Sequence, residues 1–595
     1  MDPNGSKDRL TRLLLSPQKI LPWHRLPTLI GAFSLIGTRR ELREKNLHNT
    51  EVVDLVVPDG APPPPADYKT ARTIDGTYND LDFPLMGSRG TRFGRNVPLA
   101  FTNPEPEPLL LEPNPREVSL QLMTRTTFMP ATTLNVLAAA WIQFNVHDWM
   151  THGENEIDNP WELELDDDDP WLEERMRIQR TRKDPVHGKE EPAPTFRNQI
   201  THWWDASQLY GATPERLKEL RTGEHGKMKI GEDGRLPLNP TNGMELIGFD
   251  DNYWVGLSAL HTLFVREHNA ICDMLRAKYS SWNDDELFDH ARLINAALIA
   301  KIHTVEWTPG ILAHPAVELG MDANWWGLQG KWLHAKFGRL TGSEVVSGIP
   351  GSDTNHHGAP YAITQEFVSV YRLHPLIPED FIFRSVEDDE PCAQRKLMEV
   401  QGKATRPLVE EVGHENILYS LGTSHPGQIR LHNYPRALQQ LERIDGTIMD
   451  LAATEILRDR ERGVPRYNAF REFMHKEPVR TFEELTDNPA WVEQLRRIYN
   501  NDIDRVDLLV GLLCEPLPEG FGFSETAFRV FVLMASRRLK SDRFFTVDYR
   551  PEVYTKEGLD WVANNTMVDV LLRHYPGLER SLRGVPNAFG PWARV

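Results

Sequence analysis

The stretch that decides the fold is EFVSVYRLHPL, at positions 366–376. Tyr371 and His374 stand three residues apart, so on a helix they would share nearly one face, about 4.5 Å apart along its axis. A histidine there could serve as the axial ligand of a metal, and the neighbouring phenol could give up an electron and a proton to it. The ordinary alternative is a buried tyrosine followed by a histidine that ends a helix before Pro375. These residues alone leave both interpretations open.

A second segment, WIQFNVHD at 141–148, carries polar residues on an apolar helix. Gln143 and His147 are four residues apart and share one helix face. An amide and a neutral imidazole could together handle protons on a metal-bound ligand. Asp148 points about 100° away and would serve a different site. Taken alone, a single histidine on such a helix is more often a hydrogen-bonded core residue.

The loop THWWDAS at 201–207 is rich in oxygen donors. Thr201, Asp205 and Ser207 offer side-chain oxygens, and Trp203 offers a backbone carbonyl. Calcium takes several such oxygen ligands at once. The same pattern is common in loops that bind nothing, so it needs support from elsewhere in the chain.

Together these segments resemble the distal helix and calcium loop of the animal-type haem peroxidases, which include the cyclooxygenases. The resemblance implies that His147 is the distal histidine and Gln143 its companion. It implies that Asp148 completes a calcium site with the 201–207 loop. Val146 occupies the position where some members carry an aspartate esterified to haem, so the resemblance implies a non-covalent haem b.

The 366–376 stretch is similar to the Tyr-x-x-His motif shared by cyclooxygenases and α-dioxygenases. This implies that Tyr371 is the radical site and His374 the proximal haem ligand. The segment 450–463, DLAATEILRDRERG, resembles the helix on the proximal side, where Arg458 matches an arginine that reaches a haem propionate. Glu455 stands where peroxidases have an asparagine bonded to the proximal histidine, and a carboxylate there should make the imidazole more electron-donating.

Two further segments point to the fatty acid α-dioxygenases. IHTVEWT at 302–308 is similar to the segment in which a histidine and a threonine bind the substrate carboxylate. This implies that role for His303 and Thr308. Pro309 disfavours helical geometry at Thr308, and we expect this to let Thr308 converge with His303. Val305 falls where mammalian peroxidases have a distal arginine, so peroxidase turnover should be slow.

Near the C-terminus, RRLKSDRFF at 537–545 resembles the family stretch that carries a carboxylate-binding arginine. Arg538 shares a face with Phe531 and Ala535, and its guanidinium could bind a carboxylate bidentately. Arg537 and Arg543 remain alternatives for the same role.

The activity implied by the resemblance is oxygenation of a fatty acid by dioxygen after a peroxide has activated the haem. The radical on Tyr371 would remove a hydrogen from C2, and the product would be a 2-hydroperoxy fatty acid. The first alternative is a haem peroxidase that oxidises small reductants. The second is a haem-binding sensor without turnover.

Composition limits the partners of the protein. The 595 residues carry 67 Lys and Arg against 86 Asp and Glu, a net charge of −19, so nucleic acid is not an expected partner. The same charge repels a fatty carboxylate, and binding one therefore requires a local cation. Three scattered cysteines predict a reduced, intracellular location. Neither a signal peptide nor a membrane-spanning run is visible, so we expect a soluble or peripherally membrane-associated protein.

The pattern predicts a mainly α protein: an N-terminal helical extension over 1–60, an extended arm and linker over 61–130, and a haem peroxidase-like catalytic domain over 131–595. Helical periodicity marks the segments 132–149, 254–277, 285–307, 438–457 and 526–539. Breaks are expected at 58–66, 166–169 and 183–194. Residues 10–15 and 20–30 predict two short amphipathic helices, which either lie on a bilayer surface or pack on the protein's own core.

Overall fold

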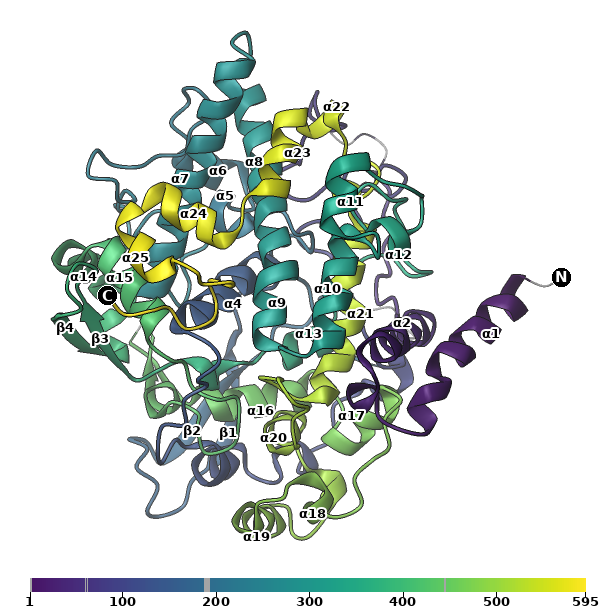
Figure 1. Cartoon of the computed structure of the whole chain (residues 1–595). Helices are drawn as coiled ribbons and strands as arrows, with labels where there is room; N and C mark the ends of the chain where they lie inside the picture. The colour runs from purple at the N-terminus through teal and green to yellow at the C-terminus, as the bar shows by residue number, and fades with distance from the viewer. Residues whose placement is uncertain (1–2, 59, 61–62, 187–192, 444–445) are drawn as a thin grey trace.

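The computed structural model describes residues 3–58, 60, 63–186, 193–443 and 446–595, and these are mainly helical (Figure 1). Two long helices, α7 (Val255–Lys278) and α8 (Asp284–Ile302), pack against each other. The side chain of Asn283 accepts a hydrogen bond from the backbone N–H of Glu286, and the Glu286 carboxylate accepts one from the backbone N–H of Asn283, so α8 begins with a capping box. Strands form only three two-stranded antiparallel sheets among the described residues. The predicted mainly α fold is confirmed.

Most of the predicted helices are present. Helix α4 (Val136–Trp149) is capped by Asn135, and α21 (Glu525–Ser541) is capped by Ser524. The helix predicted over 438–457 is wrong in its first half. That half contains a short 3-10 turn and the strand pair β5 (Leu441–Glu442) and β6 (Ile448–Met449), and α16 (Leu451–Glu461) begins only afterwards. Gly446 has a φ of +80° in the turn, and the Asp450 side chain caps a new helix.

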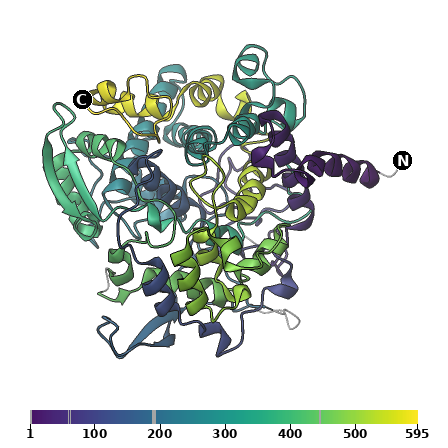
Figure 2. The same ribbon diagram turned by 60° about the horizontal axis from the view of Figure 1, so that its bottom comes forward.

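The two N-terminal helices differ in how they meet the body of the protein. Helix α2 (Thr28–Lys45) packs on α10 (Pro315–Trp326) and α21, whereas α1 (Pro3–Leu15) projects from the body in both views (Figures 1 and 2). The indole of Trp23 is buried and donates to Glu525 at 2.8 Å. The outer side of α2 nevertheless exposes Leu29 and Phe33 at 63% and 44%. Part of this extension therefore belongs to the core, and part offers apolar side chains to the outside.

Loops and small hairpins surround this helical body. The acidic run at 166–169 lies between β1 (Glu156–Glu164) and β2 (Arg175–Arg180), where Asp169 pairs with Arg116 at 2.9 Å. The hairpin of β3 (Asp380–Arg384) and β4 (Pro391–Lys396) forms one edge of the molecule (Figure 2). The breaks at 58–66 and 183–194 lie partly outside the described residues. No helix in the described part of the chain is long and apolar enough to cross a bilayer.

Candidate active site

Helix α4 runs through the interior and leaves one stripe open. Gln143, Val146 and Met150 are only half-buried, while almost every other residue of α4 is buried. His147 lies beside this stripe with its ring against Phe249, at 5.3 Å between centroids. Burial, together with His261, lowers the pKa of His147 to about 3, and Nδ1 of His147 has no hydrogen-bond partner among the described residues. His147 is therefore a neutral base whose buried Nδ1 is left without a partner in the part of the chain that the structure describes.

The amide of Gln143 is held in a fixed orientation. Its Oε1 accepts a hydrogen bond from the Trp254 indole at 2.8 Å, and its Nε2 donates to the carbonyl of Asn252 at 3.0 Å. The structure thus places Gln143 and His147 one turn apart on α4, and the amide is oriented by residues from outside the helix.

On the proximal side, His374 is bound to a buried carboxylate. Its Nδ1 lies 2.9 Å from Oε1 of Glu455, whose Oε2 accepts the hydroxyl of Tyr434 at 2.9 Å. Burial favours the neutral acid, but His374 and Arg372 nonetheless hold the pKa of Glu455 below its ordinary value. The His374 side chain is 38% exposed. Because Nδ1 faces the Glu455 carboxylate, Nε2 is the nitrogen left to bind a metal.

Tyr371 and His374 do not share a helix, contrary to the expectation from their spacing. Helix α13 (Gln365–Val370) ends before Tyr371, and His374 opens a short 3-10 turn. The backbone leaves α geometry at Tyr371, with φ −93° and ψ 12°, four residues before Pro375. The Tyr371 ring instead packs against Trp149 and Phe367, at 5.5 and 4.5 Å between centroids.

The donor groups of His374 and Arg458 are those that a haem requires. The exposed edge of His374 offers one free nitrogen, and the open stripe of α4 offers a face without bulky charged groups. Arg458 pairs with Glu461 at 2.7 Å and lines a cavity of about 600 Å³ together with Thr454. The cavity that Arg458 lines includes neither His374 nor a residue of α4. This arginine is suited to meet a propionate at the cavity wall.

Tyr371 and all three predicted carboxylate-binding residues line one small cavity, called here the carboxylate pocket. Its walls are Trp204, His303, Thr304, Thr308, Met321, Asn324, Tyr371, Ala535, Arg538 and Leu539. The residues come from four separate regions of the chain. Burial raises the pKa of Tyr371, so the phenol is protonated at neutral pH.

His303 and Thr308 converge for a reason that differs from the predicted one. Thr308 is fully helical, with φ −62° and ψ −49°, and is not displaced by Pro309. Residues His303–Trp307 instead form a π-helical turn, in which each bond spans five residues. The Thr308 hydroxyl donates to the carbonyl of His303 at 2.9 Å. A five-residue spacing therefore places both side chains on one side of the helix.

His303 has a defined tautomer. The Trp141 indole donates to Nδ1 of His303 at 3.3 Å, so a neutral ring carries its proton on Nε2. Burial and the nearby Arg538 lower the pKa of His303 well below its ordinary value. His303 is therefore a neutral hydrogen-bond donor, which suits it to an anionic ligand.

Arg538 is a buried cation without an acidic partner. Its guanidinium lies 3.8 Å above the Trp149 ring and 4.3 Å above the Trp204 ring. Its Nε and Nη2 atoms have no hydrogen-bond partner among the described residues. Asp148 acts on Arg538 electrostatically and the Tyr361 hydroxyl interacts with it, but no carboxylate in the described ranges forms an ion pair with it. Burial lowers the pKa of Arg538 from its ordinary value. Such a cation is poised to bind an anion.

The two alternative arginines are occupied elsewhere. Arg537 donates to the carbonyls of Ala359 and Pro360, both at 2.9 Å. Arg543 forms a short ion pair with Asp548 and donates to backbone carbonyls of the 68–69 segment. Only Arg538, among these three, lines the carboxylate pocket.

The predicted calcium residues also come together. Asp148 and Asp205 are both buried, and Asp205 accepts the hydroxyls of Thr201 at 3.0 Å and Ser207 at 2.6 Å. Burial and the charge of Asp205 raise the pKa of Asp148, whose Oδ2 has no hydrogen-bond partner among the described residues. Trp203 is buried beside them in the loop. Across the described ranges, no cluster of three or more His, Cys, Asp or Glu side chains could hold a metal, so a cation here would also need hydroxyl and carbonyl ligands.

Sequence analysis missed the residues that position this site. Trp149 and Trp204, whose rings are nearly perpendicular to each other, both contact the Arg538 guanidinium, Trp141 sets the His303 tautomer, and Phe249 covers His147. No local pattern identifies them, because each acts on a residue from another part of the chain. The nearness of Trp149 to the distal motif was the one available signal.

Comparison with known proteins identifies the family. The animal haem peroxidase family matches residues 71–589. Alpha-dioxygenase 1 of Capsicum annuum is 38% identical over 96% of this chain and 90% of that protein, and alpha-dioxygenase PIOX of Oryza sativa subsp. japonica is 39% identical over 96% and 93%. A crystal structure of Oryza sativa fatty acid alpha-dioxygenase with palmitic acid superposes with a TM-score of 0.91 at 36% identity, covering 98% of this chain and 97% of the other. On these grounds the chain belongs to the animal haem peroxidase family and, within it, to the α-dioxygenases.

Proposed function

We propose that this protein is a fatty acid α-dioxygenase in which Tyr371 is the radical residue. One observation carries the proposal: the phenol of Tyr371 and the unpaired cation of Arg538 line the same buried cavity. An arginine buried without an acid is costly unless an anion joins it. A carboxylate in this cavity brings its neighbouring carbon close to the phenol.

The haem would be held by His374 through Nε2 and by Arg458 at a propionate, and it would be non-covalent because Val146 cannot form an ester. Once bound and activated by a peroxide, haem supplies the oxidant that takes an electron from Tyr371. His147, which is neutral, is the base suited to move a proton on the distal side. Gln143, whose amide is held by Trp254, would be the companion of His147 on the distal side.

Arg538, His303 and Thr308 form the carboxylate clamp of this proposal. Arg538 supplies charge, and the Nε2–H of His303 donates a hydrogen bond. The Thr308 hydroxyl can turn from the backbone carbonyl to the ligand. Holding the carboxylate fixes C2 against the phenol, and orientation of this kind is a large part of catalysis.

In the chemistry at C2, Tyr371 first accepts a hydrogen atom and later returns one. The phenoxyl oxygen takes a hydrogen atom from C2, and the C2 radical adds dioxygen. The resulting peroxyl radical takes a hydrogen atom back from the Tyr371 hydroxyl. The product is a 2-hydroperoxy fatty acid, and the tyrosyl radical is regenerated.

Two further features belong to the proposal. Asp148, Asp205, Thr201, Ser207 and the Trp203 carbonyl would bind Ca²⁺, which would relieve the repulsion between the two buried carboxylates. The exposed apolar side chains of α1 and α2 would give a peripheral contact with a lipid surface, where the substrate resides.

The test is oxygen uptake by haem-loaded wild type and Tyr371→Phe with palmitate, with product identification by mass. We expect a 2-hydroperoxy acid, or the aldehyde one carbon shorter, from the wild type and neither from the variant. Both proteins should show the same Soret absorption. An unchanged lipid product from Tyr371→Phe would contradict the proposal, and turnover of phenols without lipid oxygenation would favour a peroxidase.

A further inference from the structure

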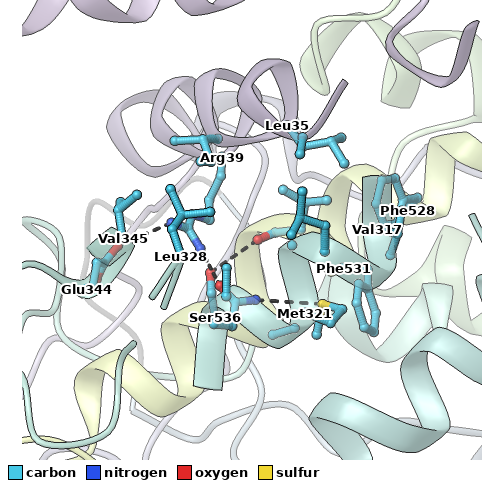
Figure 3. A pocket seen from close by; sticks show the side chains of 18 residues that line it. Leu35, Arg39, Val317, Met321, Leu328, Glu344, Val345, Phe528, Phe531 and Ser536 are labelled. Atoms are coloured by element: carbon cyan, nitrogen blue, oxygen red, sulfur yellow. Dashed lines mark hydrogen bonds and ion pairs between the residues drawn. The ribbon is translucent and has the colours of Figure 1, made fainter. Parts of the chain in front are cut away.

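An apolar pocket adjoins the carboxylate pocket, and one of its walls carries buried charge. It lies between α2, α10 and α21, and Figure 3 shows the side chains that line it. Met321, Asn324 and Ala535 line both pockets. This shared wall makes the apolar pocket a natural route to Arg538.

The two ends of this pocket differ in chemistry. Along α21, Phe528, Phe531, Val532 and Ala535 follow helical spacing toward Arg538 and form an apolar wall. Arg39 enters from α2 near the shared wall, and its Nη1 donates to Oδ1 of Asn324 at 2.6 Å. Asn324 also lines the carboxylate pocket, so the Arg39 guanidinium contacts a residue of the pocket that contains Arg538.

Arg39 belongs to a cluster with more cations than anions. The carboxylate of Glu344 lies 3.3 Å from Arg39, 2.9 Å from Arg43 and 3.5 Å from Lys540. Asp353 also acts electrostatically on Lys540. The Nε atoms of Arg39 and Arg43 are buried and have no hydrogen-bond partner among the described residues. Burial and the charge of Arg43 lower the pKa of Arg39 to about 10, as expected for a cation that lacks full compensation.

We propose that Arg39, together with Asn324, forms an outer carboxylate site, which binds a long-chain carboxylate on its way to Arg538. The inference rests on the proposed function for the identity of the ligand class. Moving a bare carboxylate through an apolar pocket of a protein with a net charge of −19 is unfavourable without a cation along the route. At Arg39 the carboxylate would compete with Glu344, and Asn324 would pass it to the carboxylate pocket.

The alternative is that Arg39 and Glu344 only staple α2 to the body. The two roles predict opposite effects on palmitate association when the charge of Glu344 is removed. If the ion pair only attaches α2 to the body, removal of either Arg39 or Glu344 weakens that attachment. An outer carboxylate site is weakened by loss of Arg39 but strengthened by loss of the competing Glu344 charge.

The test uses haem-loaded protein in the Tyr371→Phe background, so that binding is measured without turnover. Association rates of palmitate and of hexadecanol are measured by stopped-flow tryptophan fluorescence in Arg39→Leu, Arg39→Lys and Glu344→Gln. Arg40→Leu is the matched control, because it removes the same charge from the adjacent residue, about 100° around α2.

We expect Arg39→Leu to slow palmitate association about tenfold, since charges on an access route act mainly on the association rate. Arg39→Lys should retain most of the rate, Glu344→Gln should raise it, and Arg40→Leu should match the parent. Hexadecanol, which carries no charge, should bind all variants alike. Circular dichroism checks that each variant is folded. If Arg39→Leu does not fold, the association rates of Arg39→Lys and Glu344→Gln still test the inference.

The inference is overturned if Arg39→Leu leaves palmitate association unchanged, if it slows hexadecanol equally, or if Glu344→Gln slows palmitate as a broken staple would. Failure of the proposed function is a separate result. In that case the variants would show the expected pattern of palmitate association, but the wild type would consume no oxygen.

Discussion

The carboxylate of Glu455 lies 2.9 Å from Nδ1 of His374, within a buried cluster that also contains Arg372 and Tyr434. An anionic acceptor on the far nitrogen of an axial histidine makes the imidazole a stronger electron donor. The haem of this protein should therefore favour the ferric state more than that of a relative with a neutral acceptor.

Replacement of Glu455 tests this relationship. We expect Glu455→Gln to raise the ferric/ferrous reduction potential and to lower the iron–histidine stretching frequency of the ferrous protein. Tyr434→Phe is the matched variant, because it removes a donor from Glu455 and should shift the potential downward. Spectroelectrochemistry and resonance Raman spectroscopy measure both. Shifts of the same sign in the two variants would point to simple disruption of the fold.

Removal of the Arg538 charge should weaken substrate binding specifically. A charged hydrogen bond contributes about 1.5–3 kcal/mol, so Arg538→Met should raise KM for palmitate about 10- to 100-fold. Arg538→Lys should recover part of the loss, since it restores charge but not the planar fork. Arg537→Met is the control, because Arg537 binds backbone carbonyls, and it should lower Tm more than it changes KM. Equal KM values in the two methionine variants would contradict the assignment.

The paired carboxylates of Asp148 and Asp205 make stability depend on calcium. A cation held at 100 times its Kd stabilises a folded protein by about 2.7 kcal/mol, so chelation should lower Tm measurably. Asp148→Asn removes the mutual repulsion and should reduce the Tm difference between calcium-loaded and chelated protein. Differential scanning calorimetry with EGTA and added Ca²⁺ measures this difference. A Tm that is insensitive to calcium in the wild type would rule out the site.

The attachment of α2 should weaken in acid. Burial opposes ionisation of Glu344, but Arg43 and Arg39 lower its pKa to about 2. A carboxyl group with a depressed folded pKa stabilises the protein above its unfolded value near 4.5, and this contribution is lost as pH falls from there toward 2. The wild type should exceed Glu344→Gln in stability by up to about 3 kcal/mol at neutral pH, with the gap closing below pH 4.5.

The measurement is Tm against pH for both proteins, together with limited proteolysis of the N-terminal helices. Buried neutral histidines such as His147 destabilise the fold below pH 6.5 in both proteins, so only the difference between the curves reports on Glu344. A difference that stays constant from pH 7 to pH 3 would show that ionisation of Glu344 does not hold α2.

Much of the fold was predictable because local patterns are strong in this chain. The apolar run of α4, the apolar periodicity of α7 and α21, and the caps of α4 and α21 mark helices without any tertiary information. The prediction failed at 438–457, where Gly446 and Asp450 end one element and begin another inside a helix-like pattern. It also failed at Tyr371 and His374, because α13 ends at Val370 and His374 belongs to a separate 3-10 turn.

By itself, the sequence determined the helical class, the family motifs and the residue types that haem and a carboxylate require. Only the tertiary structure decided which arginine is free, because Arg537, Arg538 and Arg543 look alike in the chain and differ in what lies around them. Arg538 lies against the rings of two tryptophans and forms no ion pair among the described residues, whereas the other two are satisfied by backbone carbonyls or an acid. The physical reason is that desolvation and hydrogen-bond partners are set by residues distant in sequence, so the electrostatic state of a buried group exists only once the chain has folded.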